Sequence, residues 1–431
     1  MRTSPGQGQA LLAQQTVVPQ GRLFVPPSYY QTTGATEWTL NGANDSVAFS
    51  WIQECDMSLT SLSVHVAAVT TQGNVNLALH ADSFGDPGTQ IADLGSVDCG
   101  ASPGWVRHSF SAQQLSRGTR YHVVCTGTAA KSYALSSKLP QPVLGSMLPD
   151  GTYSKRRLDG AETWTFIYPG SYSLERGSLN VILNSTADHV PPLVYGQYSG
   201  RFIHVPGSGL VSIPESGISL DCASLTAGSV SYVYAYMNGT ALTLEAATTQ
   251  PTVSNGIWVK SGDAGRVYLG MICPQSIQTG KQGPVDVPDR RLVANRHNQI
   301  IKNCGKWRIY TGGSSENLNA MPATWGAWMN GDDFRTQILI HGSSMRFFAH
   351  YGYFTNAMVQ IAIGFATDSP APESSANSWT AGCQMACHRA YGLYDIWPLR
   401  RNINGYTSGA VYYSYIDGTY GHASFMGEIY G

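Results

Sequence analysis

Apolar and polar residues alternate in short runs along most of this chain. In residues 231–237, tyrosine occupies every second position, and Val, Ala and Met fill the positions after them. Comparable strand-like runs cover 57–70, 119–126, 346–351 and 424–430. A period of two is the pattern of a β-strand, and short strands spaced roughly 8–12 residues apart are typical of β-sandwiches. The pattern predicts an all-β protein, with several sandwich-like or jelly-roll-like modules in a row.

Shifts in composition divide the chain into four segments. Residues 1–32 are rich in Gln, Pro and Gly and have no hydrophobic period, so they are expected to form an extended arm. Three domains should follow: a jelly-roll-like sandwich over 33–188, a small β domain over 189–285, and a C-terminal β-sandwich over 286–431. No repeat of about 20–50 residues is found, which argues against a β-helix of stacked coils.

Turn-forming residues predict where several strands are connected. Residues 83–90, SFGDPGTQ, are expected to form a long loop, because Asp86-Pro87-Gly88 is a strong turn signal. Residues 261–265, SGDAG, predict a five-residue hairpin loop, and residues 369–378, SPAPESSANS, predict a long exposed loop.

The composition restricts the classes of function. Charged residues make up 12% of the chain and the formal net charge is −1, so no basic surface for nucleic acid is expected. No run of 18 apolar residues is present, so no membrane-spanning helix is predicted. The first 20 residues lack an apolar segment of signal-peptide length, and we therefore expect synthesis in a cytosol.

The arm is too polar to order itself by burying its own surface. We expect it to dock onto neighbouring subunits of a larger assembly. The predicted docking residues are its apolar and aromatic side chains together with one arginine: Arg2, Leu11, Leu12, Val17, Val18, Phe24, Tyr29 and Tyr30.

Four stretches of the second half carry a resemblance to a known class of protein. They are GIWVKSGDA-x-R-x-YLGMI at 256–272, RRLVANRHNQIIKNCGKWRIYTG at 290–312, QILIHGSSMRFFAHYGYF at 337–354 and GTYGHASFMGEIYG at 418–431. Through them, roughly residues 195–431 resemble tailed-phage virion structural proteins of the fiber, spike or decoration type. The first domain more loosely resembles glycan-binding jelly-roll sandwiches, through DPGTQIADLG at 86–95 and LSRGTRYHVV at 115–124.

The resemblance implies a non-enzymatic virion protein without cofactor, commonly a homotrimer, that contacts other capsid or tail proteins and a host surface glycan. It provides no catalytic residues to carry over. A capsid-attached fiber or decoration spike is the first expectation, and a tail-fiber or baseplate receptor-binding protein is the second. A polysaccharide depolymerase, which needs carboxylates clustered in a cleft, and a secreted carbohydrate-binding protein, which needs an export signal, are alternatives from other classes.

Two motifs resemble catalytic sites, but simpler interpretations are favoured. Gly100-Ala101-Ser102-Pro103-Gly104 matches G-x-S-x-G, yet a nucleophile elbow leads into a helix, and here proline and a predicted strand follow. Asp332-Asp333, with Glu316 upstream, suggests a glycosidase pair, but adjacent strand residues point to opposite faces. A turn is expected at the first site, and a turn or helix start at the second.

The eight cysteines are spread thinly, unlike those of a disulfide scaffold. Buried free thiols and disulfides both remain open. The C-x₃-C-H spacing at 383–388 also fits zinc, but a second cysteine pair is missing, so no metal is predicted. A bridge within 383–387 would require a turn or helical stretch, because extended residues lie too far apart. The candidate disulfide cysteines are Cys99, Cys125, Cys222, Cys273, Cys383 and Cys387.

The C-terminal region is rich in aromatic residues. Exposed rings stack on sugars and contribute strongly to protein interfaces, so Trp397 and Tyr415 are candidate surface-binding residues. The alternative is that the aromatic residues pack in a core or around a trimer axis.

Overall fold

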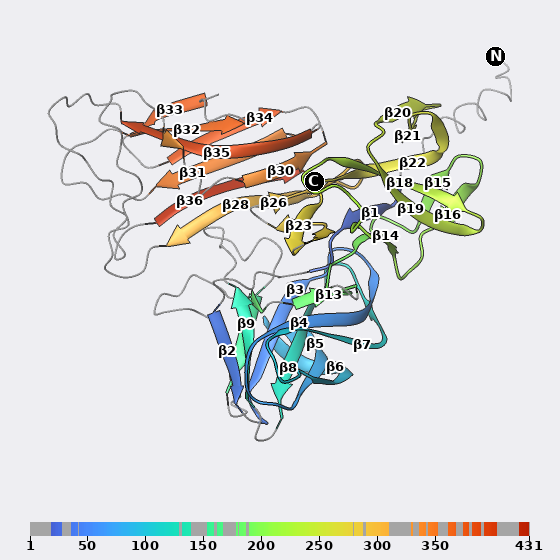
Figure 1. Cartoon of the computed structure of the whole chain (residues 1–431). Helices are drawn as coiled ribbons and strands as arrows, with labels where there is room; N and C mark the ends of the chain where they lie inside the picture. Colours follow the sequence, from blue (N-terminus) through green and yellow to red (C-terminus); the bar gives the residue numbers. More distant parts are fainter. Residues whose placement is uncertain are drawn as a thin grey trace, which may run out of the picture.

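The fold of the chain is all-β, as the alternating pattern predicts. Strands make up 66% and helices 0% of the part that the structure describes. Figure 1 shows these strands gathered in separate sheets. The computed structural model describes residues 19–27, 36–41, 43–128, 132–138, 153–158, 162–166, 178–179, 181–186, 189–278, 280–287, 290–309, 329–330, 336–341, 344–351, 361–367, 374–378, 382–388, 392–402 and 422–430.

Two sheets of the first unit face each other as a sandwich. The first contains, in spatial order, β11 (Thr165–Phe166), β10 (Tyr153–Arg157), β3 (Ser46–Ile52), β8 (Arg120–Gly127), β5 (Asn74–Ser83) and β6 (Asp86–Asp98). The second contains β12 (Ser178–Leu179), β9 (Ser132–Lys138), β4 (Met57–Thr71) and β13 (Val181–Leu183), with β2 (Thr36–Asn41) on β9 and β7 (Gly104–Leu115) on β4. A β-sandwich is thus present, whereas jelly-roll connectivity stays a prediction.

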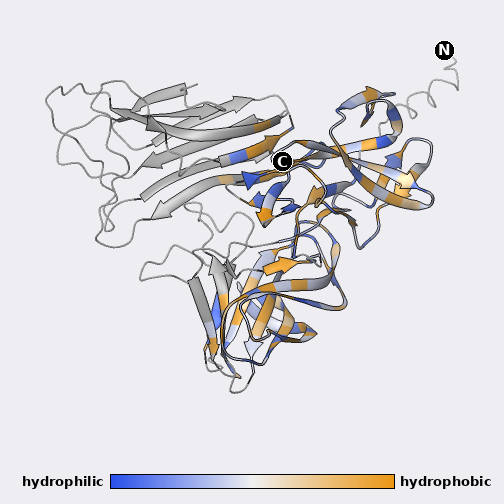
Figure 2. Ribbon diagram, viewed as in Figure 1, coloured by the Kyte–Doolittle hydropathy of each residue, from blue (hydrophilic) through white to orange (hydrophobic). Residues whose placement is uncertain are grey.

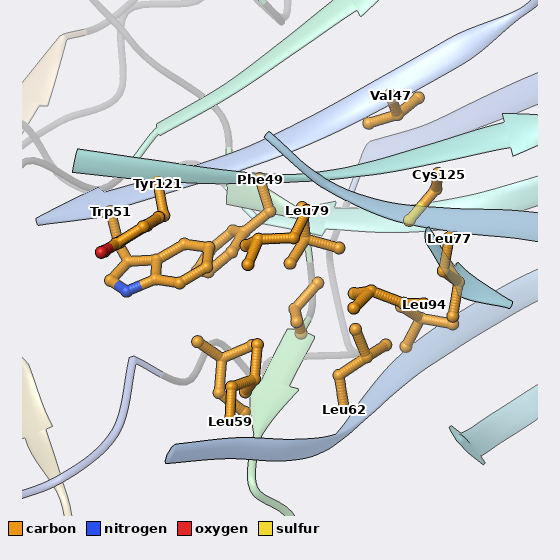
Figure 3. Packing of buried hydrophobic residues seen from close by; sticks show 14 of the residues in the cluster. Val47, Phe49, Trp51, Leu59, Leu62, Leu77, Leu79, Leu94, Tyr121 and Cys125 are labelled. Carbon is orange, nitrogen blue, oxygen red and sulfur yellow. The ribbon is translucent and has the colours of Figure 1, made fainter. Parts of the chain in front are cut away.

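The core of this sandwich is filled by apolar residues from both sheets. Phe49, Leu79 and Val123 come from one sheet, and Leu59 and Leu62 come from the other, all 0% exposed. Figure 3 shows Phe49 and Leu79 facing Leu59 and Leu62 between the sheets. Figure 2 shows hydrophobic and hydrophilic residues alternating along the strands. Burial of one such side chain contributes about 1.5–3 kcal/mol, so this interior stabilises the unit.

The middle unit contains two larger sheets and two hairpins. One sheet has the order β1 (Gly21–Phe24), β14 (Leu193–Gln197), β17 (Ile218–Leu220). The other has the order β19 (Ala241–Ala247), β18 (Ser231–Asn238), β22 (Asp263–Ile272), β21 (Ile257–Lys260), β20 (Pro251–Ser254), with β27 (Val293–Asn295) paired to β22. The hairpins are β15 (Phe202–Val205) with β16 (Gly209–Ser212) and β23 (Gln275–Gln278) with β24 (Lys281–Gly283).

The last unit has one large and one small sheet. The large sheet has the order β25 (Asp286–Val287), β26 (Arg290–Arg291), β30 (Thr336–Ile340), β35 (Gly392–Asn402), β32 (Ile361–Thr367), β33 (Ser374–Ser378), with β29 (Met329–Asn330) on β35. The small sheet has the order β28 (Ile301–Ile309), β36 (His422–Tyr430), β31 (Ser344–Tyr351), β34 (Gly382–His388). Leu339 of β30 is buried in one apolar cluster with Tyr234 and Tyr268, so this unit packs on the middle one.

The predicted turns differ from the observed ones in three places. The expected loop over 83–90 is a two-residue turn, Phe84-Gly85, and Asp86-Pro87-Gly88 lies within β6. Proline is tolerated there because β6 is the edge strand of its sheet. The hairpin loop between β21 and β22 is also shorter than predicted, and edge strand β33 lies within the expected loop over 369–378.

Candidate functional site

Most of the predicted docking arm lies outside the described residues. Arg2, Leu11, Leu12, Val17, Val18, Tyr29 and Tyr30 all belong to that group. Phe24 is described, and the prediction that it docks onto a neighbouring subunit is wrong. It lies in β1, is 0% exposed, and packs in the core of the chain's own first sandwich. Burial within the same chain removes this ring from water and leaves it unavailable to a partner.

Strand β1 forms a wall shared by two cores. Because successive side chains of a strand point to opposite faces, Leu23 packs in the middle core and Phe24 in the first. The paired strand β14 does the same, with Tyr195 in the middle core and Val194 in the first. Figure 1 shows β1 beside β14 above the first sandwich. The cores of the first two units therefore pack on opposite faces of the same two strands.

Asparagine side chains hold β1 in place along its free edge. Asn295 accepts a hydrogen bond from the Leu23 amide at 2.7 Å and donates to the Leu23 carbonyl at 2.9 Å. Asn298 donates to the carbonyls of Pro19 and Gly21, both at 2.9 Å. These amides replace the partner strand that an edge otherwise lacks, so residues 19–24 are tied to the body of the protein.

A buried ion network joins β1 to the other units. The Arg22 side chain is 0% exposed, and its Nε lies 2.5 Å from Oε1 of Glu54. Lys302 Nζ lies 3.5 Å from the same oxygen and also forms an ion pair with Asp286. Arg291 Nη1 lies 3.4 Å from Asp286 Oδ1. One carboxylate from the first unit therefore balances cations from β1 and β28.

The network holds Glu54 ionised. Burial alone raises the pKa of this carboxyl, but Lys302 and Arg22 outweigh burial and lower the pKa to about 2. Buried ion pairs add little net stability, but loss of one partner leaves an uncompensated charge and is costly. The arrangement therefore favours a single relative placement of β1, Glu54 and β28.

A second buried chain of polar groups supports the tip of the β5–β6 hairpin. Ser50 is hydrogen-bonded to Nδ1 of His122, and Nε2 of the same ring lies 2.9 Å from Asp82 Oδ1. Asp82 in turn accepts a hydrogen bond from the Gly85 amide at 3.1 Å. Ser50 and His122 are both 0% exposed. A serine so enclosed cannot reach a substrate, so the Ser-His-Asp order here acts as a structural brace.

The braced turn presents an exposed aromatic residue. Phe84 is fully exposed and has a φ of 52°, in the left-handed region that bulky residues rarely adopt. Gly85 follows with a φ of 86°, which completes a turn with two left-handed residues. The sequence does not predict this tip, because the turn signals at Asp86-Pro87-Gly88 are stronger than those of Phe84.

The remaining predicted binding residues are placed only in part. Trp397 lies in β35, opposite Ala366 of β32, and Tyr415 lies outside the described residues. The two residues are therefore not shown to share a surface.

The cysteines that the structure describes with side chains are buried. Cys99, Cys125, Cys222 and Cys273 form no disulfide. Burial raises the pKa of the first three to about 12, so they are protonated and unreactive at neutral pH.

The candidate bridge between Cys383 and Cys387 is wrong as an internal link. Both residues lie in strand β34, whose backbone is extended. Four residues of strand span roughly 13 Å, whereas a disulfide needs Cα atoms within about 7 Å.

No family model matches the chain, and no curated protein matches it either. Over the described ranges, the structure has no group of three or more His, Cys, Asp or Glu side chains arranged to hold a metal ion. None of the described residues belongs to a helix of the length and apolarity needed to cross a membrane.

Proposed function

We propose that this protein is a structural subunit of a tailed-phage virion, attached through residues 1–18 and presenting its β modules at the particle surface. A capsid-attached fiber or decoration spike is the favoured assignment, with host-surface binding as its task. The proposal starts from the resemblance of residues 195–431 to such proteins and from the low charge and tandem β modules of the chain.

The structural observation that supports the proposal is the position of β1 between the first two cores. Residues 19–24 are fixed to the body by β14, by Asn295 and Asn298, and by the ion pair of Arg22 with Glu54. The residues before Pro19 are thus joined to a strand that is packed firmly against the body of the protein. Such a connection suits a subunit that holds its modules at a set orientation to a particle, where many weak contacts act together through avidity.

Labelling of intact particles tests this assignment. Gold-labelled antibody against the purified protein is expected to decorate particles, at the capsid for a head fiber or at the tail for a tail fiber. A variant that lacks residues 1–18 should fold normally but fail to join particles when it is supplied together with the natural chain. Purified particles that lack the chain would refute the proposal, and cleavage of host polysaccharide would favour a depolymerase.

A further inference from the structure

Lys302 and Asp286 contact each other in the interior of the protein. Asp286 belongs to β25 and Lys302 to β28, and their side chains are 5% and 4% exposed. Nζ of Lys302 forms an ion pair with Oδ2 of Asp286. A primary amine and a carboxyl group that touch in this way are the two reactants of amide formation. Fixed contact between well-oriented reactants corresponds to an effective concentration of about 10⁵–10⁸ M.

A second ion pair between lysine and aspartate is open to water. Asp86, the partner of Lys155, has a side chain that is 43% exposed. Water stabilises an ammonium and a carboxylate as ions, whereas burial makes both ions costly. Condensation of Lys302 with Asp286 replaces two buried charges by one neutral amide. The enclosed pair therefore has a driving force towards the amide that the exposed pair lacks.

Two charged groups lie beside this pair, where amide formation needs them. Oε1 of Glu54 lies 3.5 Å from Nζ of Lys302, and Glu54 is ionised in the folded chain. Nη1 of Arg291 lies 3.4 Å from Oδ1, the second carboxyl oxygen of Asp286. A carboxylate within reach of an amine can carry its proton, and a fixed guanidinium stabilises negative charge that develops on an oxygen. Lys302 can lose its own proton, whereas the guanidinium groups around it stay charged.

We propose that Lys302 and Asp286 condense into an amide that covalently links β28 to β25. Within the ion pair, one proton passes from Nζ to Oδ2, which leaves a neutral amine and a neutral carboxyl group. The electron pair of Nζ forms a bond to Cγ of Asp286, and negative charge moves to Oδ1 beside Arg291. Glu54 takes a second proton from Nζ and returns it to Oδ2. The bond between Cγ and Oδ2 breaks, and Oδ2 leaves with both protons as water.

The amide closes a loop of the chain around β27. Asp286 and Lys302 are 16 positions apart, and the segment between them contains β27, which pairs with β22 of the middle sheet. Closing a loop restricts the unfolded chain, so the link stabilises the contact between the last unit and the middle one. The reaction requires no partner molecule, so it does not depend on the assignment to a particle.

The mass of the intact natural chain tests the bond. The full-length protein, folded at neutral pH and then denatured with its cysteines reduced, should be lighter than its sequence by one water molecule. Trypsin should release residues 282–290 and 297–306 as one joined peptide, because the amide blocks cleavage at Lys302 and links it to Asp286. A chain with the full sequence mass, or a deficit of one water without this joined peptide, would refute the bond.

Two lysine variants provide a matched comparison. Lys302→Arg keeps the cation but replaces the amine, so this variant should have its full sequence mass. Lys155→Arg changes the water-exposed pair with Asp86 and should keep the deficit of one water. If a folded Lys302→Arg variant still lacks one water, that water is lost elsewhere in the chain and the proposed bond is wrong.

Glu54→Gln tests the proton carrier. A glutamine amide does not take the proton from Nζ, so this variant should retain the unreacted ion pair of Lys302 with Asp286 and its full sequence mass. Complete amide formation in a folded Glu54→Gln variant would overturn the role of Glu54. The natural chain decides whether the bond exists even where a variant fails to fold. Absence of the chain from particles would refute the particle assignment without changing any of these masses.

Discussion

At the scale of single residues, substitution of Glu54 should destabilise the ion network that joins β1 to β28. We expect Glu54→Gln to reduce the free energy of unfolding at pH 7 by about 3–5 kcal/mol, because Arg22 then lies buried without a carboxylate partner and Lys302 keeps only Asp286. Urea denaturation followed by tryptophan fluorescence measures the loss. Glu215→Gln, at an exposed position, should change stability by less than about 0.5 kcal/mol. Equal stability of the two variants would contradict the role of Glu54.

The same carboxyl gives the fold a dependence on acid. Its pKa is about 2 in the folded chain and about 4.5 when unfolded, so the unfolded chain binds the proton more readily. The contribution of Glu54 is therefore complete above pH 4.5 and is lost as the pH falls towards 2, by at most about 3 kcal/mol. The stability difference between the natural chain and Glu54→Gln should narrow over that range. A constant difference from pH 6 to pH 2.5 would argue against the depressed pKa.

Phe84 provides a residue whose replacement should stabilise the protein. A left-handed conformation costs a bulky residue about 1–2 kcal/mol, whereas Asn adopts it readily. The turn between β20 and β21 has Asn255 with a φ of 51° in the equivalent place. Phe84→Asn should therefore raise the melting temperature by a few degrees, and Asn255→Phe should lower it by a similar amount. Calorimetry measures both, and a lower melting temperature for Phe84→Asn would contradict the strain.

These residues show the limit of what the sequence predicts about the site. Arg22 and Glu54 lie 32 positions apart, and Arg22 and Asn298 lie 276 apart. No period or motif joins such pairs, since tertiary packing alone brings them together. The sequence predicts an arm that docks onto neighbouring subunits, whereas residues 21–24 of that arm pack against the chain itself.

At the scale of elements, the pairing of β22 with β27 depends on one glycine. A Cβ on Gly270 would lie 2.2 Å from the Ala294 carbonyl oxygen, which belongs to the backbone and cannot move without breaking the pairing. Gly270→Ala should reduce the free energy of unfolding by about 1–3 kcal/mol and speed amide exchange in residues 293–295. Gly265→Ala in the same strand meets only the flexible end of Asp263 and serves as control.

Long regular strands were predictable, and short connecting ones were not. The runs at 57–70 and 231–237 correspond closely to β4 and β18, because each is long enough to show the period of two. In β18 both faces are buried, Val233 in one core and Tyr234 in another. By contrast, β27 has three residues, too few to show a period, and it adds to the middle sheet from beyond the predicted boundary at 285. Residues 293–295 form a strand because they pair with β22, and their own sequence does not predict it.

At the scale of the whole molecule, β1 makes the first two units depend on each other. Removal of residues 1–18 leaves β1 and its contacts untouched, so this variant should unfold at the same urea concentration as the natural chain. Removal of residues 1–24 opens the wall between the two cores and takes Arg22 from Glu54. Two lost apolar side chains at about 1.5–3 kcal/mol each, added to the broken ion pair, predict a loss of more than about 5 kcal/mol.

The longer deletion should also change how the units unfold. With β1 present, tryptophan fluorescence and far-ultraviolet circular dichroism should report one coincident transition for the first two units, because both cores pack on β1 and β14. Without β1, the unfolding transitions followed by fluorescence and by circular dichroism should no longer coincide. A synthetic peptide of residues 19–27 should restore part of the stability by adding the missing strand to β14, in proportion to its concentration. If both deletions unfold alike and the peptide has no effect, β1 does not hold the units together, and the attachment of residues 1–18 to a firm base loses its structural support.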